Sequence, residues 1–146
     1  MDNKTKGLME FTELETVEFE KMAVIIHAKH DALSKLNTRM VQQILVEELE
    51  ELKRIKAVEM ERAAILKQLS LSGNDLNQPS VLEKKLGGEA VNIFVPLHSN
   101  FKKAFARVVS LNGVSRVLLK HSLAFIKQNI NILTEGGKRK LVDRKA

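Results

Sequence analysis

The chain has 146 residues, 44% of them apolar and 29% charged, with no Cys, Trp or Tyr. This length fits one domain, the composition excludes a disordered chain, and the lack of Cys excludes disulfides, thiol nucleophiles and thiolate metal sites. The formal net charge of +6 is uneven, because residues 1–75 carry 11 Lys/Arg against 14 Asp/Glu (net −3) and residues 76–146 carry 13 against 4 (net +9). The basic half favours an acidic partner, but the scarce aromatics argue against base stacking on nucleic acid.

The amino-terminal segment and the apolar runs indicate a protein that is neither secreted nor inserted in a membrane. MDNKTKGLMEF mixes charges and has no apolar stretch of the kind that a signal peptide needs. The longest uncharged apolar run, residues 22–26, is far shorter than the ~20 residues that cross a bilayer. We therefore expect a soluble, cytoplasmic protein that makes no contact with a membrane.

Two long helices are predicted in the first half. Over residues 11–36, apolar residues recur at steps of three and four without Gly or Pro, which is typical of a helix with one apolar face. That predicted face consists of Phe11, Leu14, Val17, Met22, Ile25, Ile26, Leu33 and Leu36. Asn37 and Thr38 are good N-cap residues, so a second helix is predicted over residues 38–69. Its predicted apolar seam consists of Val41, Ile44, Leu45, Leu49, Leu52, Ile55, Ala63, Leu66 and Leu69, with the charged side chains between residues 47 and 56 on a solvated face.

Turn-forming residues dominate residues 70–80, which predicts a break. Ser80 and Glu83 have the spacing of a capping box, so a short connector helix is expected over residues 80–86, ended by the following glycine pair. A long helix is predicted over residues 96–133, with Pro96 in its first turn. Its apolar phase continues across Asn112-Gly113, so one helix is expected there.

No alternating strand pattern of useful length is present. The sequence therefore predicts an all-α fold, an elongated antiparallel bundle made of a helical hairpin plus a long C-terminal helix. A single helical domain is expected over residues 1–136, followed by a basic C-terminal tail over residues 137–146.

Catalytic or metal chemistry finds little support in the residue pattern. His27 and His30 lie three residues apart beside Asp31, but the spacing suggests no third ligand, and zinc needs three or four. A phosphotransfer helix would resemble a His followed three residues later by Lys, which neither His30 nor His121 provides. No Gly-rich loop follows a strand as in a phosphate cradle. We expect no enzyme activity, no cofactor and no metal.

The apolar residues of the last helix are the strongest functional signal. Most apolar stripes on helices pack inward, but this one spreads over more than one face, through Leu118, Leu119, Leu123, Phe125, Ile126, Ile130, Ile132 and Leu133. Exposed apolar surface of that extent marks a partner site, and docking of a partner helix suits it.

Two blocks of the sequence resemble the FlgN-type flagellar export chaperones. Residues 41–70, with leucines amid Glu and Lys and then Glu-Arg-Ala-Ala-Ile-Leu at 61–66, are similar to the long second helix of that family. Residues 112–134 resemble its C-terminal helix, in which an Asn, a Leu pair, Ser-Leu and an aromatic residue follow in this order. Members often carry a Tyr in the glycine-flanked tail, where this chain has Leu141, Val142 and Asp143.

The resemblance implies a cytoplasmic chaperone of flagellar type III export. Such chaperones bind the C-terminal helices of the hook–filament junction proteins FlgK and FlgL, prevent their premature assembly and deliver them to the export apparatus. The implied partner-binding residues are Leu118, Leu119, Ser122, Leu123, Phe125, Ile126, Ile130 and Leu133, with Arg116 and Lys120 helping orientation. Two alternatives are a self-associating helical scaffold without an export role, which includes a homodimer, and a nucleic-acid binder that uses the basic half.

Overall fold

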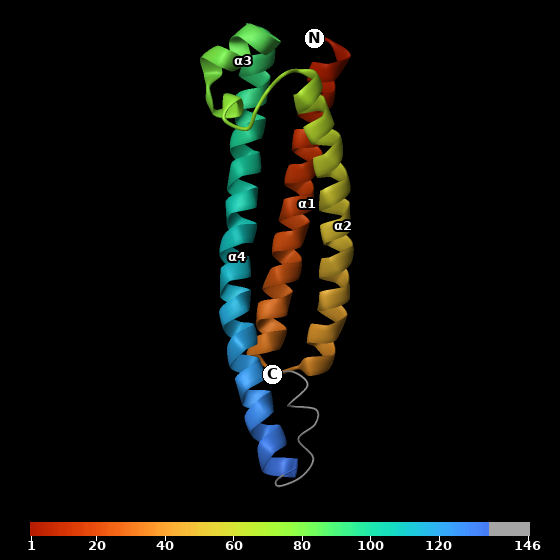
Figure 1. Cartoon of the computed structure of the whole chain (residues 1–146), viewed down its shortest axis with the longest axis vertical. Helices are drawn as coiled ribbons and strands as arrows, with labels where there is room; N and C mark the ends of the chain where they lie inside the picture. Colours follow the sequence, from red (N-terminus) through yellow and green to blue (C-terminus); the bar gives the residue numbers. More distant parts are fainter. Residues whose placement is uncertain (135–146) are drawn as a thin grey trace.

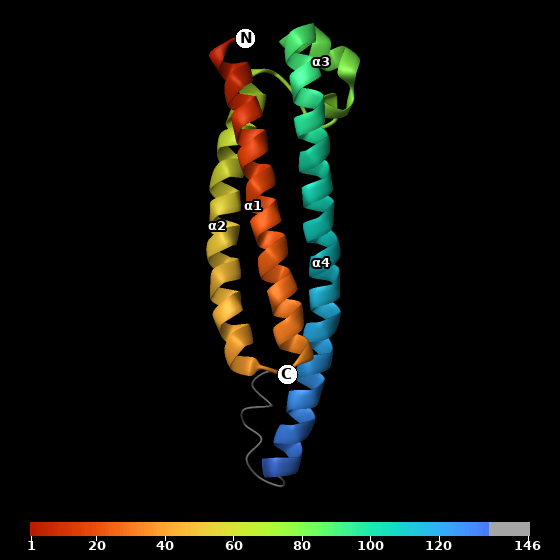
Figure 2. The same ribbon diagram turned by 180° about the vertical axis from the view of Figure 1, so that it is seen from behind.

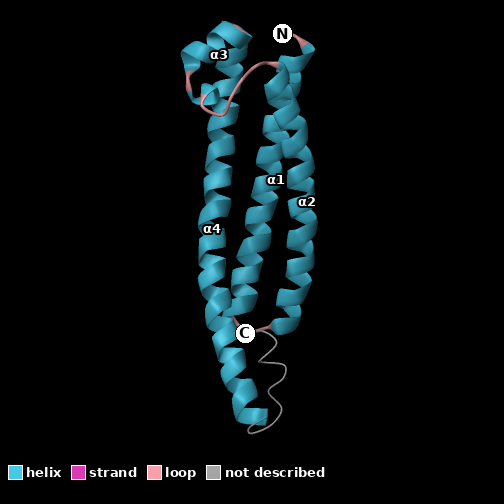
Figure 3. Cartoon of the chain, viewed as in Figure 1, coloured by secondary structure: helices cyan, strands magenta, loops and turns pink. Residues whose placement is uncertain are grey.

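Three long helices form an elongated bundle in the computed structural model, which describes the backbone of residues 1–134 and the side chains of residues 1–114. These helices are α1 (Asn3–Ser34), α2 (Thr38–Gln68) and α4 (Gly88–Thr134) (Figure 1). A short 3-10 helix, η1 (Asp75–Asn77), and helix α3 (Pro79–Leu86) connect α2 to α4. Helices and their connections make up the whole described backbone (Figure 3). The predicted all-α bundle is confirmed.

Helix α1 is the central element of the bundle. It packs against both α2 and α4, whereas α2 and α4 make little contact with each other. The chain runs down α1, back up α2, across the top through η1 and α3, and down α4, so α4 is parallel to α1 and antiparallel to α2 (Figures 1 and 2). In both views α4 continues past the turn between α1 and α2. One side of α1 therefore lies between two helices that do not close over it.

The ends of α1 and α2 follow from their capping groups. The Asp2 carboxylate accepts a hydrogen bond from the Thr5 backbone N–H at 2.7 Å, which lowers the pKa of Asp2 and begins α1. Two residues after each helix ends, the chain adopts the left-handed conformation in which glycine is usual, at Leu36 (φ 53°) and at Ser70 (φ 55°). The next residues close each end with a backbone hydrogen bond of 2.9 Å, from Asn37 to Ala32 and from Leu71 to Leu66.

One end of the bundle is closed by a hydrophobic cluster drawn from α1, η1, α3, α4 and the segment that follows α2. This closed-end cluster consists of Leu8, Met9, Leu71, Leu76, Leu82, Ala90 and Phe94. Leu8 and Phe94 are completely buried in it. A Cβ atom on Gly7 would lie 3.0 Å from Ile65 Cδ1, so α1 and α2 approach closely here. The η1–α3 segment thus covers, at this end, the side of the bundle that the long helices leave uncovered.

The closed-end cluster explains two errors in the predicted boundaries. Helix α1 begins at Asn3 rather than near residue 11, and α4 begins at Gly88 rather than at Pro96. The added turns carry Leu8 and Phe94, whose burial stabilises them. Pro96 consequently lies inside α4 rather than in its first turn. It removes one helical hydrogen bond, a cost that the packing of its neighbours offsets.

The predicted capping box of α3 is also wrong. The helix starts at Pro79 with Gln78 as N-cap, and no side-chain hydrogen bond caps it. Proline at the first position has no orphan N–H to satisfy, so the helix can start one residue before Ser80. Its end agrees with the glycine signal, because Gly87 adopts φ 89° and α4 begins at the next residue.

A second correction concerns the buried face of α1. Leu14 and Val17 are 43% and 40% exposed, while Thr12, Glu15 and Thr16 are buried. The Thr12 and Thr16 hydroxyls donate to the carbonyl oxygens of Leu8 and Thr12, at 2.6 and 2.8 Å, so they tolerate burial. Because α2 and α4 flank α1 on two sides, its buried surface is wider than its apolar stripe.

Candidate functional site

The covered end of the bundle stops at His98 of α4. The Asn77 side-chain oxygen from η1 lies 3.3 Å from His98 Nε2 and accepts a hydrogen bond from Lys102 Nζ at 3.1 Å. The His98 ring stacks between Phe94 and Phe101, with ring centroids 5.5 and 6.0 Å away. Burial lowers the pKa of His98 to about 4, helped by Lys102 and Arg62, so the ring is neutral at pH 7. Beyond this level, α3 and η1 no longer cover the bundle.

Below His98 a groove of about 390 Å³ opens between α2 and α4, with α1 as its floor. We call it the open groove. Its floor is formed by Glu15, Phe19 and Met22, its α2 wall by Leu52, Ile55, Glu59 and Arg62, and its α4 wall by Phe101, Phe105, Val108, Val109 and Asn112. The lining is mainly apolar, and it faces the side of the bundle on which α2 and α4 fail to meet.

The walls of the open groove expose large apolar side chains. Leu52 is 44% exposed on α2, and Phe105 and Val109 are 50% and 54% exposed on α4. Leu45 and Leu49, at helical steps from Leu52, are 44% and 55% exposed on α2. The sequence predicted these leucines as part of a buried seam, which the structure contradicts. Contiguous exposed apolar surface of this kind is typical of a binding site.

The floor and the α4 wall are held together by aromatic contacts. The Phe19 ring lies 5.4 Å from Phe101 and 5.5 Å from Phe105, centroid to centroid, at tilted angles of 54° and 57°. Phe19 belongs to a second cluster, made of Phe19, Met22, Ala23, Ile26, Ile55, Ala104 and Val108. Tilted aromatic pairs add about 0.5–1.5 kcal/mol beyond the area that they bury. The groove therefore rests on a preformed floor.

An acidic and a basic side chain, Glu15 and Arg62, are buried at the upper end of the open groove. The Arg62 guanidinium lies over the Phe101 ring, 4.2 Å from its centroid, and its Nε donates to the Thr12 hydroxyl at 3.1 Å. Among the described residues, Arg62 Nη2 and Glu15 Oε1 are buried polar atoms without a hydrogen-bond partner. Burial raises the pKa of Glu15 to about 7, against the opposing effect of Arg62. Each unpaired buried group costs about 1–3 kcal/mol.

A pair of buried carboxyls, Glu18 and Glu51, lies between α1 and α2. Glu18 and Glu51 are 6% and 1% exposed, although the sequence predicted Glu51 on a solvated face. Burial and the neighbouring Glu18 raise the pKa of Glu51 to about 6, while the hydrogen bond from Glu51 lowers the pKa of Glu18. Arg54 donates to Glu51 at 3.2 Å. The two carboxyls thus share one proton, which is released as the pH rises through about 6.

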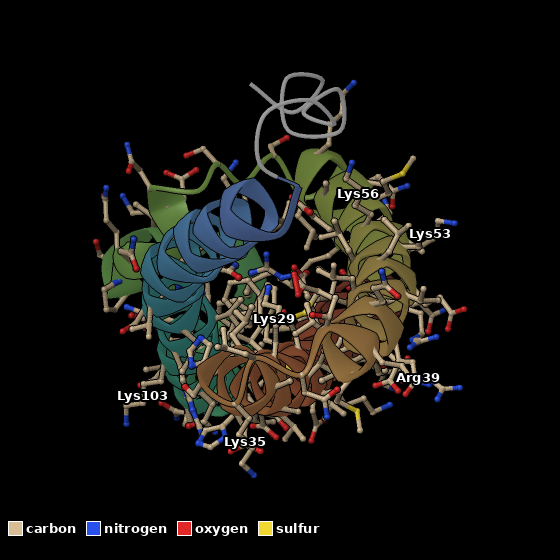
Figure 4. All side chains as sticks on the ribbon, turned by 90° about the horizontal axis from the view of Figure 1, so that it is seen from below. Lys29, Lys35, Arg39, Lys53, Lys56 and Lys103 are labelled. Atoms are coloured by element: carbon tan, nitrogen blue, oxygen red, sulfur yellow. The ribbon has the colours of Figure 1, made fainter. Side chains whose placement is uncertain are left out.

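Polar contacts mark the far end of the open groove. Lys29, 8% exposed, donates to the Glu48 carboxylate of α2 at 2.9 Å. His30 Nε2 lies 2.9 Å from the carbonyl oxygen of Leu111 in α4. Figure 4, seen from below, shows Lys29 pointing between the three helices while Lys35 and Lys103 point outward. Lys29 and His30 therefore join α1 to both walls.

The residues predicted as the partner-binding site lie farther along α4. They are Arg116, Leu118, Leu119, Lys120, Ser122, Leu123, Phe125, Ile126, Ile130 and Leu133, and the backbone of α4 extends through all of them. Their side chains lie outside the described residues, as does the tail at 137–146. The open groove begins on the same helix before them, and it was not predicted from the sequence. The one feature of the sequence that could have indicated the groove is the number of leucines on α2, which is larger than α1 alone can cover.

The chemistry of the described residues is that of a binding surface. Within residues 1–114 no three His, Asp or Glu side chains come together as metal ligands, and no helix of the described chain is both long and apolar enough to cross a membrane. His27 and His30 lie 6.5 Å apart between ring centroids, and His30 is engaged with α4. What the groove offers is apolar area with two buried charges at one end.

Comparisons with known proteins agree with the sequence resemblance. The sequence profile of one protein family, described as "FlgN protein", matches residues 1–142. No curated protein matches the chain, and no solved structure matches it either. Because the match covers nearly the whole chain, it includes all four α-helices and the open groove. The chain therefore belongs to the FlgN family, and it is a FlgN-type flagellar chaperone.

Proposed function

We propose that this chain is a cytoplasmic chaperone that binds the C-terminal helices of the hook–filament junction proteins FlgK and FlgL. It keeps these helices from assembling prematurely and delivers their proteins to the flagellar export apparatus. The observation that carries the proposal is the family match over residues 1–142. The exposed apolar walls of the open groove support it, because a holding chaperone needs apolar surface that its own fold leaves uncovered.

The mechanism is stoichiometric capture. An amphipathic client helix buries its apolar face against the chaperone instead of against another client, and the complex separates at the export apparatus. Burying ~600 Å² would give on the order of 15 kcal/mol of gross transfer energy. Ordering and association costs offset most of it, which leaves the complex reversible. Arg116 and Lys120 orient the client. Because the chain contains no Tyr, other side chains make its contact with the export apparatus.

Co-purification with tagged FlgK and FlgL tests the proposal. In the full-length chain, Leu119→Lys together with Ile126→Lys places two charges in the predicted client-binding stretch of α4, and we expect recovery of both clients to fall about tenfold or more. Leu14→Lys is the control, because Leu14 is already 43% exposed on α1 and lies outside the groove. Equal recovery with the double variant and the control would contradict the assignment of these α4 residues. Failure of the wild-type chain to retain either client would contradict the function.

The exposed leucines of α2 are also compatible with the alternative function, a scaffold that associates with itself. Leu45, Leu49 and Leu52 have the spacing of a coiled-coil seam and are about half exposed. Analytical ultracentrifugation with and without the clients separates the two functions. A chaperone changes its sedimentation when a client is added, whereas a scaffold stays in one oligomer that ignores the clients.

A further inference from the structure

We propose that the open groove holds a fourth helix, supplied by an exported client, whose apolar stripe carries one Asn or Gln amide between Glu15 and Arg62. This inference rests on the proposed function and deepens it. It adds described residues of α1, α2 and α4 to a binding site that the sequence placed only at residues 116–133 of α4. It also states the chemistry by which the groove selects its occupant.

The first support is the shape of the bundle. Helices α2 and α4 both pack on α1 and make little contact with each other. At the closed end, η1 and α3 cover the space beside them, and Leu76 and Leu82 are buried there. Below Asn77 the open groove lies on the same side, bounded by both long helices. A helix placed in it would complete a four-helix arrangement, the ordinary way of burying such faces.

The second support is the apolar register of the walls. Leu52 lines the α2 wall, and the exposed side chains of Leu49 and Leu45 continue its row along α2 beyond the groove, at steps of three and four. Phe105 and Val109 on the α4 wall are one turn apart. An occupant with apolar side chains at the same helical spacing would cover both rows at once. The groove therefore fits an amphipathic helix better than an extended peptide, which would leave its own backbone groups to be satisfied.

The third support is the pair of buried polar atoms. Glu15 and Arg62 are 2% and 8% exposed, and both line the groove, yet Glu15 Oε1 and Arg62 Nη2 have no hydrogen-bond partner among the described residues. A side-chain amide both donates and accepts, so its NH₂ can donate to Glu15 while its oxygen accepts from Arg62.

Other side chains fit this end of the groove less well. A carboxylate on the occupant would be repelled by the ionised form of Glu15, and an ammonium group would be repelled by Arg62. An aliphatic side chain would leave both buried atoms unsatisfied. The buried atoms of Glu15 and Arg62 therefore favour an occupant helix that carries one Asn or Gln in an otherwise apolar stripe.

Isothermal titration of the full-length chain with synthetic peptides tests the location. The peptides are the C-terminal helices of FlgK and FlgL. Val109→Lys puts a charge on the groove wall, and Val24→Lys, at a valine 69% exposed outside the groove, is the matched control. We expect Val109→Lys to weaken binding about tenfold or more and Val24→Lys to leave the dissociation constant unchanged. Far-UV circular dichroism checks that both variants remain folded.

A double-mutant cycle tests the amide. Each Asn and Gln on the apolar stripe of the peptide is replaced by Leu, in separate peptides, and each is titrated against the wild type and against Arg62→Met. We expect one replacement to weaken binding to the wild type about tenfold and to weaken binding to Arg62→Met less, because the hydrogen bond from Arg62 is already lost there and only the bond to Glu15 remains. Equal effects on both proteins at every position would overturn the proposed amide contact.

The remaining outcomes separate this inference from the function on which it rests. Peptides that bind Val109→Lys as tightly as wild type, but fail to bind Leu119→Lys with Ile126→Lys, overturn the groove and leave the chaperone function standing. Tighter binding to Val109→Lys would mean that a segment of the chain itself occupies the groove. A wild-type dimer that Val109→Lys converts to a monomer would mean that a second copy occupies it. The last two outcomes also overturn the inference.

Discussion

The closed end and the open groove are built on the same three helices, yet they differ in what faces α1. At the closed end, η1 and α3 cover the bundle, and the cluster around Leu8 and Phe94 is wholly apolar. In the open groove nothing among the described residues covers the corresponding side, and Phe105 and Val109 are half exposed. The buried atoms Glu15 Oε1 and Arg62 Nη2 have no hydrogen-bond partner among the described residues. The comparison shows that one end of the bundle has a closed core, while the other leaves apolar surface uncovered by the described residues.

The largest expected contrast comes from removing one phenylalanine from each end. Phe94→Ala should lower the free energy of unfolding by about 3–5 kcal/mol, because Phe94 is completely buried. Phe105→Ala should lower it by only about 1 kcal/mol, because Phe105 is already half exposed. Urea denaturation followed by circular dichroism measures both. Similar losses at the two sites would remove the distinction between the ends.

A pH series tests the cost of the buried carboxyl in the groove. The pKa of Glu15 is raised to about 7 by burial, so the unfolded chain releases this proton at a lower pH than the folded chain does. The stability contributed by protonated Glu15 is therefore complete below about pH 4.5 and is lost as the pH rises toward 7.

Glu15→Gln cannot ionise, so it isolates this effect from the other titrating groups. Relative to wild type, the variant should gain on the order of 2–3 kcal/mol in free energy of unfolding between pH 4.5 and pH 7.5. The quantity to compare is the difference between the variant and the wild type, because His98 also titrates in this range. Burial lowers the pKa of His98 to about 4, so its effect on the free energy of unfolding rises with pH where that of Glu15 falls. A constant difference across the series would mean that Glu15 is ordinarily solvated.

The smallest expected effect concerns the turn that leads from α2 to the closed end. Ser70 is exposed and holds a left-handed conformation with φ 55°, which glycine adopts without strain. Ser70→Gly should raise the free energy of unfolding by about 0.5–1 kcal/mol. Ser70→Ala keeps the Cβ atom and serves as the control, for which thermal unfolding should show no gain. A gain with alanine would point to the hydroxyl rather than to the backbone.

The sequence predicted the parts of the fold that depend on local signals. The helical class, the break after Leu69 and the end of α3 at Gly87 follow from periodicity and from turn residues. The starts of α1 and α4 were wrong for one shared reason. Their first turns are stabilised by the closed-end cluster, in which Leu8 meets Phe94, and contacts between residues so far apart leave no local pattern.

The open groove could not be predicted from the sequence, for a different reason. An apolar stripe such as Leu45, Leu49 and Leu52 looks the same whether or not another helix covers it, so periodicity predicted burial where the structure shows exposure. Glu15 and Arg62 were hidden because charged residues on a helix are usually solvated. Their burial follows from the position of α1 between two neighbours.

The connections between the helices make the two walls of the groove mechanically unequal. At the far end, α2 is tethered to α1 by a tight turn through Leu36, whereas α4 is linked to α3 only at the opposite end. Near that far end, α4 is fastened to α1 by noncovalent contacts such as the one between His30 and Leu111. A guest that widened the groove would therefore strain only noncovalent contacts on the α4 side, whereas on the α2 side it would also strain the covalent turn.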